Sequence, residues 1–102
     1  MEQNVNTELD SQELAQDGLL VNFVYTALQA KRVSVAGTFN NWSSEAFILK
    51  KDLIGNWRGA LHLKPGRYQY RYNVDGRWVN DPSARNTTRN EFGTTNTILV
   101  VR

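Results

Sequence analysis

Apolar residues recur at every second position through much of the chain, which is the spacing of β-strands with one buried and one exposed face. The clearest run is residues 67–74, whose even positions are apolar or aromatic: Tyr68, Tyr70, Tyr72 and Val74. Further runs with strand character occupy residues 19–27, 33–39, 57–63 and 97–101. Turn residues separate these runs and no long helical pattern appears, so the sequence predicts an all-β antiparallel sandwich or small barrel.

The dipeptide Asp75-Gly76 predicts a two-residue type I′ turn, because both central residues of that turn need positive φ. Such a turn fixes which residues oppose each other: Val74 and Arg77, Asn73 and Trp78, Tyr72 and Val79, Arg71 and Asn80. Opposed residues share one face of a sheet. The register therefore predicts that Val79 joins the tyrosines in the core, and that Trp78 lies on the exposed face with Gln69, Arg71, Asn73 and Asn80.

The other two tryptophans differ in their surroundings. Trp57 alternates in phase with Leu61 and Leu63, which predicts a core residue, whereas His62 between them is expected at the surface. Trp42 lies in a polar loop, residues 40–44, directly after the strand expected to end at Phe39. It either contributes to a site or closes one end of the sandwich. Trp78 either contributes to a binding site or is covered by a loop or by the N-terminal tail.

Residues 1–18 form a polar N-terminal extension, and residues 19–102 form the predicted domain. Five acids and no Lys or Arg fall within residues 1–17. Asp10 and Glu13 have the spacing of a capping box, so the extension is expected to be an acidic tail with at most a short helical turn.

Charge and composition narrow the classes of function. The domain carries all 12 Lys and Arg against five acids, a net charge of +7, which suits nucleic acid, anionic partners or neutral sugars. The chain has no Cys and one His, so the sequence predicts neither a metal site nor a cofactor. With no apolar run long enough for a membrane span, no signal peptide and no myristoylation signal, we expect a cytoplasmic protein that does not contact membranes.

Two exposed tryptophans surrounded by Asn, Thr, Gln and Arg side chains are suited to sugars. The C–H face of a pyranose stacks on an indole, and its hydroxyls need donors and acceptors with little net charge. Such a site works without catalytic groups.

Four motifs of the chain resemble known sequences. They are residues 35–43 (VAGTFNNWS), 66–72 (GRYQYRY), 74–82 (VDGRWVNDP) and 92–96 (FGTTN). In this order and spacing they are similar to the family 48 carbohydrate-binding modules, which include glycogen-binding domains of kinase β subunits and N-terminal domains of isoamylases.

The resemblance implies an immunoglobulin-like, early-set β-sandwich that binds α-1,4-glucans such as glycogen, starch and malto-oligosaccharides. It implies that Trp42 and Trp78 stack on glucose units and that Arg71 hydrogen-bonds sugar hydroxyls. The sugar-contacting positions of the last loop fall on Phe92, Thr94 and Asn96. Secondary candidate contacts are Asn41, Asn73 and Asn80. The implied role is to target an associated glycogen- or starch-metabolising enzyme, or a kinase in trans, to the polysaccharide.

The sequence leaves three alternatives to glucan binding. An enzyme is disfavoured because the acids of the domain nominate no catalytic pair: Glu45, Asp52, Asp75, Asp81 and Glu91. A protein-interaction sandwich that has lost sugar binding is the main alternative, and a single-stranded nucleic-acid binder is the lesser one. Phe92 in particular could instead close one end of the core.

Overall fold

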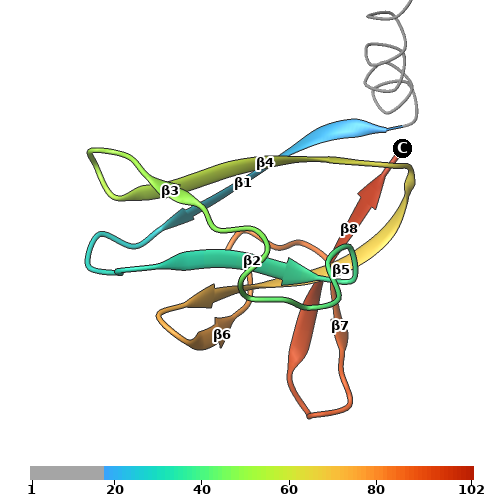
Figure 1. Cartoon of the computed structure of the whole chain (residues 1–102). Coiled ribbons are helices and arrows are strands. Elements are labelled where there is room, and N and C mark those ends of the chain that lie inside the picture. Colours follow the sequence, from blue (N-terminus) through green and yellow to red (C-terminus); the bar gives the residue numbers. More distant parts are fainter. Residues whose placement is uncertain (1–17) are drawn as a thin grey trace, which may run out of the picture.

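A computed structural model describes residues 18–102, which fold into eight strands and two antiparallel sheets (Figure 1). Within this part of the chain there is no helix, and the two sheets lie face to face as a sandwich. The predicted all-β, early-set sandwich is confirmed. The expected acidic tail and helical turn lie outside the described residues.

The smaller sheet has the order β1-β4-β3, with β1 at Leu19–Thr26, β4 at Asn56–Leu63 and β3 at Lys50–Lys51. The larger sheet has the order β2-β5-β8-β7, formed by β2 (Val33–Gly37), β5 (Gly66–Val74), β8 (Thr95–Val101) and β7 (Thr87–Arg89). Strand β6 (Arg77–Val79) adds to this sheet by pairing with the end of β5.

Strand β5 is the centre of the larger sheet. It pairs with β2 along one edge, and with β8 and then β6 along the other. Its alternation follows the predicted pattern, since Tyr70, Tyr72 and Val74 are buried while Gln69 and Arg71 point to the opposite face. One strand thus supplies both the core and the outer surface of the sheet.

Aromatic side chains fill the space between the sheets. The ring of Phe23 on β1 lies 5.2 Å from that of Tyr70 and 5.7 Å from that of Phe47, both edge-on. Tyr25 packs on Tyr72 at 4.9 Å, so both sheets contribute rings to one cluster. Trp57 is buried as predicted, and its indole N–H donates to the carbonyl of Ala27.

The β5–β6 turn has the predicted geometry. Asp75 and Gly76 both have positive φ, 50° and 91°, and the pairs Val74–Arg77, Asn73–Trp78 and Tyr72–Val79 are confirmed. The fourth predicted pair is absent from the ladder because β6 ends at Val79. Asp75 has an additional role, since its carboxylate accepts hydrogen bonds from the backbone N–H groups of Lys31 and Arg32.

Strand β2 ends at Gly37, and the prediction that it extends to Phe39 is wrong. Beyond Gly37 the backbone turns, and the N–H groups of Asn40 and Trp42 donate to the carbonyl of Gly37. The Asn40 side chain accepts a hydrogen bond from the N–H of Gly37 and donates one to the carbonyl of Val35. These local bonds satisfy backbone groups on the edge of β2 that faces away from β5, where the N–H of Val35 donates to the carbonyl of Phe47. The short strands β3 and β7 were not predicted, and β8 begins two residues earlier than expected.

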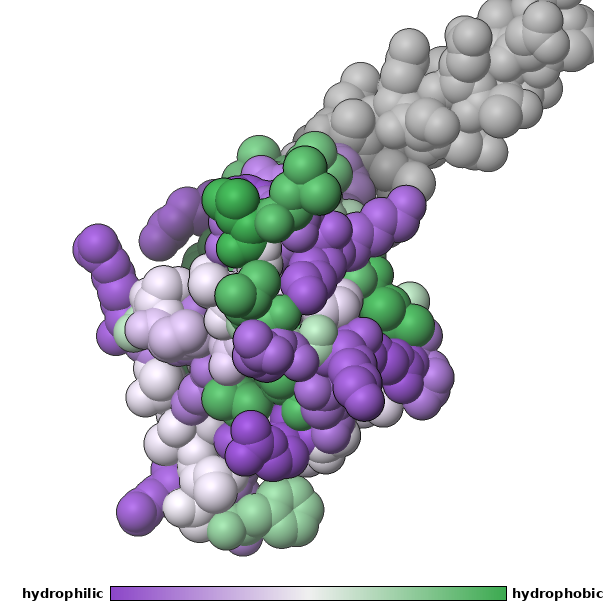
Figure 2. Space-filling view, turned by 90° about the vertical axis from the view of Figure 1, so that its left-hand side faces the viewer, coloured by the Kyte–Doolittle hydropathy of each residue, from purple (hydrophilic) through white to green (hydrophobic). Residues whose placement is uncertain are grey.

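Aliphatic side chains are exposed at the end of the domain where the β1–β2 and β3–β4 loops meet. Leu28, Leu53 and Ile54 lie here, and apolar side chains gather among polar ones on this face in Figure 2. The loops are joined by a bond from the Lys51 ammonium to the carbonyl of Leu28. No helix of residues 18–102 is long and apolar enough to cross a membrane.

Phe23→Ala tests the aromatic cluster. Removing this ring leaves a cavity between the sheets, so we expect the free energy of unfolding to fall by about 3 to 5 kcal/mol in urea denaturation. Leu53→Ala is the control, because Leu53 is fully exposed. It should change the free energy of unfolding by less than about 0.5 kcal/mol. Equal losses in the two variants would contradict this description of the core.

Alanine substitutions at two glycines test two different costs, namely backbone strain at Gly76 and steric collision at Gly37. Gly76 has φ of 91° and open space around its Cα, so Gly76→Ala should cost about 1 kcal/mol from the left-handed backbone alone. A Cβ on Gly37 would lie 2.3 Å from the carbonyl oxygen of Gln69. Gly37→Ala therefore has to displace β2 from β5, and we expect the larger drop in melting temperature for this variant. The reverse order would refute the close packing at Gly37.

Candidate functional site

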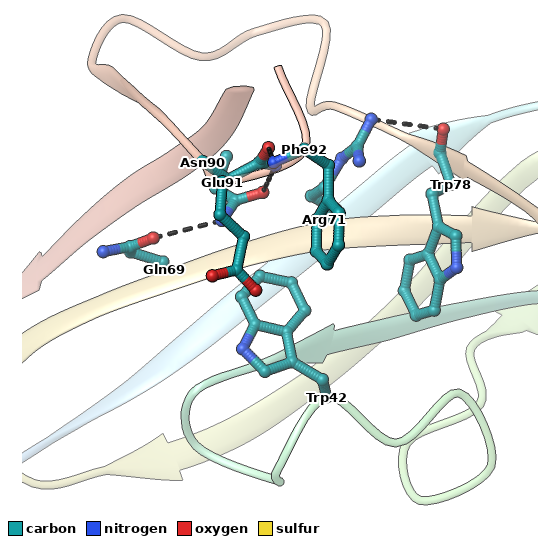
Figure 3. A pocket seen from close by; sticks show the side chains of 8 residues that line it. Trp42, Gln69, Arg71, Trp78, Asn90, Glu91 and Phe92 are labelled. Carbon is teal, nitrogen blue, oxygen red and sulfur yellow. Dashed lines mark hydrogen bonds between the residues drawn. The ribbon is translucent and has the colours of Figure 1, made fainter. Parts of the chain in front are cut away.

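A hollow of about 480 Å³ opens on the outer face of the larger sheet. It is lined by residues from five separate segments: Trp42, Gln69, Arg71, Trp78, Asn90, Glu91, Phe92 and Asn96. Gln69 and Arg71 come from the outward positions of β5, while the aromatic residues come from the β2–β3 connection, from β6 and from the β7–β8 turn (Figure 3). The lining is therefore aromatic around a polar floor.

The two tryptophans predicted for the site meet in this hollow. The ring centroids of Trp42 and Trp78 lie 6.5 Å apart with their planes inclined by 74°. Trp78 is 42% exposed, and Trp42 is half-buried. Trp78 is on the outer face because it opposes Asn73 in the register of β5 and β6.

Trp42 is held in an unfavourable backbone conformation. Both Asn41 and Trp42 have φ near +57°, at 56° and 58°, a region that costs a residue with a Cβ about 1 kcal/mol. The turn is retained by hydrogen bonds from the N–H groups of Asn40 and Trp42 to the carbonyl of Gly37, at 3.1 and 2.9 Å. Strained positions that the surrounding structure maintains are concentrated at functional sites. This geometry presents the indole of Trp42 to the hollow.

Arg71 lies between Trp78 and the last turn. Its guanidinium donates to the carbonyl of Trp78 at 3.3 Å and to the hydroxyl of Thr94 at 3.4 Å. Its Nε is buried without a hydrogen-bond partner among the described residues. Each terminal nitrogen of the guanidinium carries two N–H donors and has one protein acceptor, so each retains a donor for a ligand with hydroxyl groups.

The turn from β7 to β8 carries Phe92. This ring is 81% exposed and projects toward the two indoles in Figure 3, so the alternative in which it closes the core is wrong. Gly93 has φ of 84°, and the carboxamide of Asn90 accepts hydrogen bonds from the N–H groups of Phe92 and Thr94. The turn is therefore fixed by its own side chains.

The remaining sequence candidates divide into two groups. Asn96 lines the hollow, but it is only 6% exposed and both ends of its carboxamide are bonded within the protein. Thr94 is not a lining residue, and its hydroxyl accepts a hydrogen bond from Arg71. The three secondary candidates do not line the hollow. Asn41 shapes the Trp42 loop, Asn73 accepts from the N–H of Gly76, and Asn80 bonds to the hydroxyls of Thr95 and Thr97.

Three lining residues were not among the sequence candidates, namely Gln69, Asn90 and Glu91. The predicted register places Gln69 on the same face as Arg71 and Trp78, and this shared outward phase is the signal for its place in the hollow. Asn90 and Glu91 lie in an irregular stretch, and no periodic pattern relates them to β5. Their place follows from the antiparallel pairing of β7 with β8.

A partly buried hydrogen bond supports the segment that follows Trp78. The hydroxyl of Tyr70 donates to the carboxylate of Asp81. Burial raises the pKa of Tyr70 above its ordinary value, and the bond to Asp81 raises it further. The tyrosine therefore remains a neutral donor, which anchors the segment after β6 to the core.

Charge within the hollow is limited to Arg71 and Glu91. No cluster of three or more potential metal ligands exists among residues 18–102. The geometry suits a largely neutral ligand with apolar faces and a hydroxylated rim.

Comparisons with known proteins place this chain in a family. The protein family described as the glycogen recognition site of AMP-activated protein kinase matches residues 19–102. The 5′-AMP-activated protein kinase subunit beta-2 of Mus musculus is 38% identical over 72 residues, which cover 71% of this chain and 26% of that protein. Subunit beta-1 of Sus scrofa has the same identity over the same length, covering 56% of that protein.

The matched segment thus spans about a quarter of the mouse subunit. The four motifs that carry the resemblance all lie within residues 19–102, where the family match also falls. The family predicted from the sequence is confirmed. This chain belongs to the family of glycogen recognition domains found in AMP-activated protein kinase.

Proposed function

We propose that this domain binds α-1,4-linked glucans, such as glycogen and starch, in the hollow and does not convert them chemically. The observation that carries the proposal is the convergence of Trp42, Trp78 and Arg71 on one surface. The indoles provide stacking faces for pyranose rings, and Arg71 provides donors for their hydroxyls. The name of the matching family, a glycogen recognition site, supports the same ligand.

The inclination of the two indoles favours a curved ligand. Planes that meet at 74° cannot both stack on a flat ribbon. Successive glucose units of an α-1,4 chain turn relative to one another, whereas a β-1,4 chain is extended and flat. Phe92, exposed between these faces, supplies a further apolar contact at the rim. The arrangement therefore supports α-linked over β-linked glucans.

The number of carboxylates in the hollow supports glucan binding without catalysis. Glycoside hydrolysis uses a pair of carboxyl groups on the two sides of the scissile bond. Among the residues lining the hollow, Glu91 alone has a carboxylate. The domain thus supplies recognition, and any chemistry belongs to a partner.

The role that follows is targeting. A single module with one open hollow binds weakly, but several copies on one polysaccharide gain avidity. The mammalian relatives are kinase subunits by name. A kinase, or an enzyme of glycogen or starch metabolism, is the partner that this domain would bring to the polymer.

Trp78→Ala measures the stacking contribution. Loss of one indole face should weaken maltoheptaose binding by about 2 kcal/mol, or about thirtyfold in Kd, as measured by calorimetry. His62→Ala is the control, because His62 is exposed on β4 of the other sheet. An unchanged affinity in Trp78→Ala would remove this residue from the site.

A ligand and salt series separates glucan binding from the alternatives. We expect Trp fluorescence to respond to maltoheptaose but not to cello-oligosaccharides, with little change between about 50 and 200 mM salt. Binding of single-stranded nucleic acid would weaken steeply over that range. No response to any α-glucan at millimolar concentration would refute the proposed function and favour the hypothesis of a protein-interaction module.

A further inference from the structure

Three carboxamide side chains cross the floor of the hollow in one hydrogen-bonded chain. Asn90 donates through Nδ2 to Oδ1 of Asn96 at 3.1 Å, and Asn96 donates through Nδ2 to Oε1 of Gln69 at 3.1 Å. The three residues come from the β7–β8 turn, β8 and β5. We call this set, Asn90, Asn96 and Gln69, the amide chain.

Asn90 has no hydrogen-bonding capacity left for a ligand. Its Oδ1 accepts from the backbone N–H groups of Phe92 and Thr94, at 2.9 and 3.1 Å. Its Nδ2 donates to the hydroxyl of Thr94 at 2.8 Å as well as to Asn96. A carboxamide has two acceptor sites and two N–H donors, and all four are occupied. Asn90 therefore acts on the hollow through its neighbours.

The direction of the amide chain is determined by the backbone. The N–H groups of Phe92 and Thr94 can only donate, so they require the oxygen of Asn90 on their side and place its NH₂ group toward Asn96. Asn96 must then offer its oxygen to Asn90 and its NH₂ group to the next residue. The oxygen of Gln69 accepts that bond, which leaves the NH₂ group of Gln69 at the end of the chain.

We propose that the NH₂ group of Gln69 is a ligand-contacting donor for sugar hydroxyl oxygens, and that Asn90 is the positioning residue that orients it. Gln69 lines the hollow and its NH₂ group has no protein acceptor among the described hydrogen bonds. Hydrogen bonds in a directed chain polarise one another, so the terminal donor is strengthened. The inference rests on the proposed function, because it names a contact within the same hollow.

Gln69→Glu tests the donor directly. A glutamate keeps an oxygen for the N–H of Asn96 and removes both donors, so we expect maltoheptaose to bind about five- to tenfold more weakly. Gln69→Met, which is neutral and of similar length, should show a comparable loss and so exclude an effect of added charge. Gln29→Glu is the matched control, because Gln29 is exposed in the β1–β2 loop. It should bind as the wild type does.

Asn90→Asp tests the positioning role. The carboxylate still accepts from the N–H groups of Phe92 and Thr94 but cannot donate to Asn96. We expect these two amides to remain protected from hydrogen exchange, while glucan affinity falls by about the same factor as in Gln69→Glu. In the double variant, Gln69→Glu with Asn90→Asp, the two losses should not add, because both act through one donor.

The outcomes distinguish the two proposals. A wild-type protein that binds no α-glucan refutes the proposed function. A wild-type protein that binds, together with Gln69→Glu and Gln69→Met variants whose affinity is within twofold of it, overturns the donor role of Gln69. Additive losses in the double variant overturn the positioning role of Asn90. In the wild type, the side-chain NH₂ resonance of Gln69 should shift on glucan addition, whereas that of Gln29 should not.

Discussion

The alternation of side chains along β5 is the constraint on which the rest of the structure depends. The inward residues, Tyr70 and Tyr72, pack with rings from the smaller sheet, and the outward residues, Gln69 and Arg71, form the floor of the hollow. A shift of one residue would exchange the two faces along the whole strand. Burial of the tyrosines therefore fixes the register that presents the polar floor. The core and the candidate site are two consequences of the same packing.

Polar contacts around the rim of the hollow hold its side chains in place before a ligand binds. The Asn40 side chain bonds to the backbone of Gly37 at the turn that holds Trp42 in its left-handed conformation, while Asn90 fixes the turn that carries Phe92. Between them, Arg71 links Thr94 to the carbonyl of Trp78. Side chains that are already ordered lose little conformational entropy on binding. For a weak ligand such as a sugar, this preorganisation decides how much of the contact energy remains as affinity.

The structure shows that the positive charge of the domain, evident from its composition, is not concentrated at the candidate site. Arg32 forms an ion pair with Glu45 and lowers the pKa of that carboxyl group, and Arg58 pairs with Asp52. These pairs lie outside the hollow, whose charged side chains are Arg71 and Glu91. The excess of Lys and Arg therefore does not form the lining of the candidate site. A neutral polyhydroxylated ligand fits this lining better than a polyanion does.

Sequence patterns by themselves determined the presence of the five longer strands, the β5–β6 register, the buried Trp57 and the outward Trp78. These follow from the period of two and from the turn chemistry of Asp75-Gly76. The four motifs likewise indicated the family that matches residues 19–102. Only the tertiary structure decided that β2 ends at Gly37, that Asn41, Asn73 and Asn80 lie outside the hollow, and that Asn90 and Glu91 lie in it. The reason is physical. Local patterns specify which face a residue takes, whereas the lining of a hollow depends on which distant turns the packed sheets bring together.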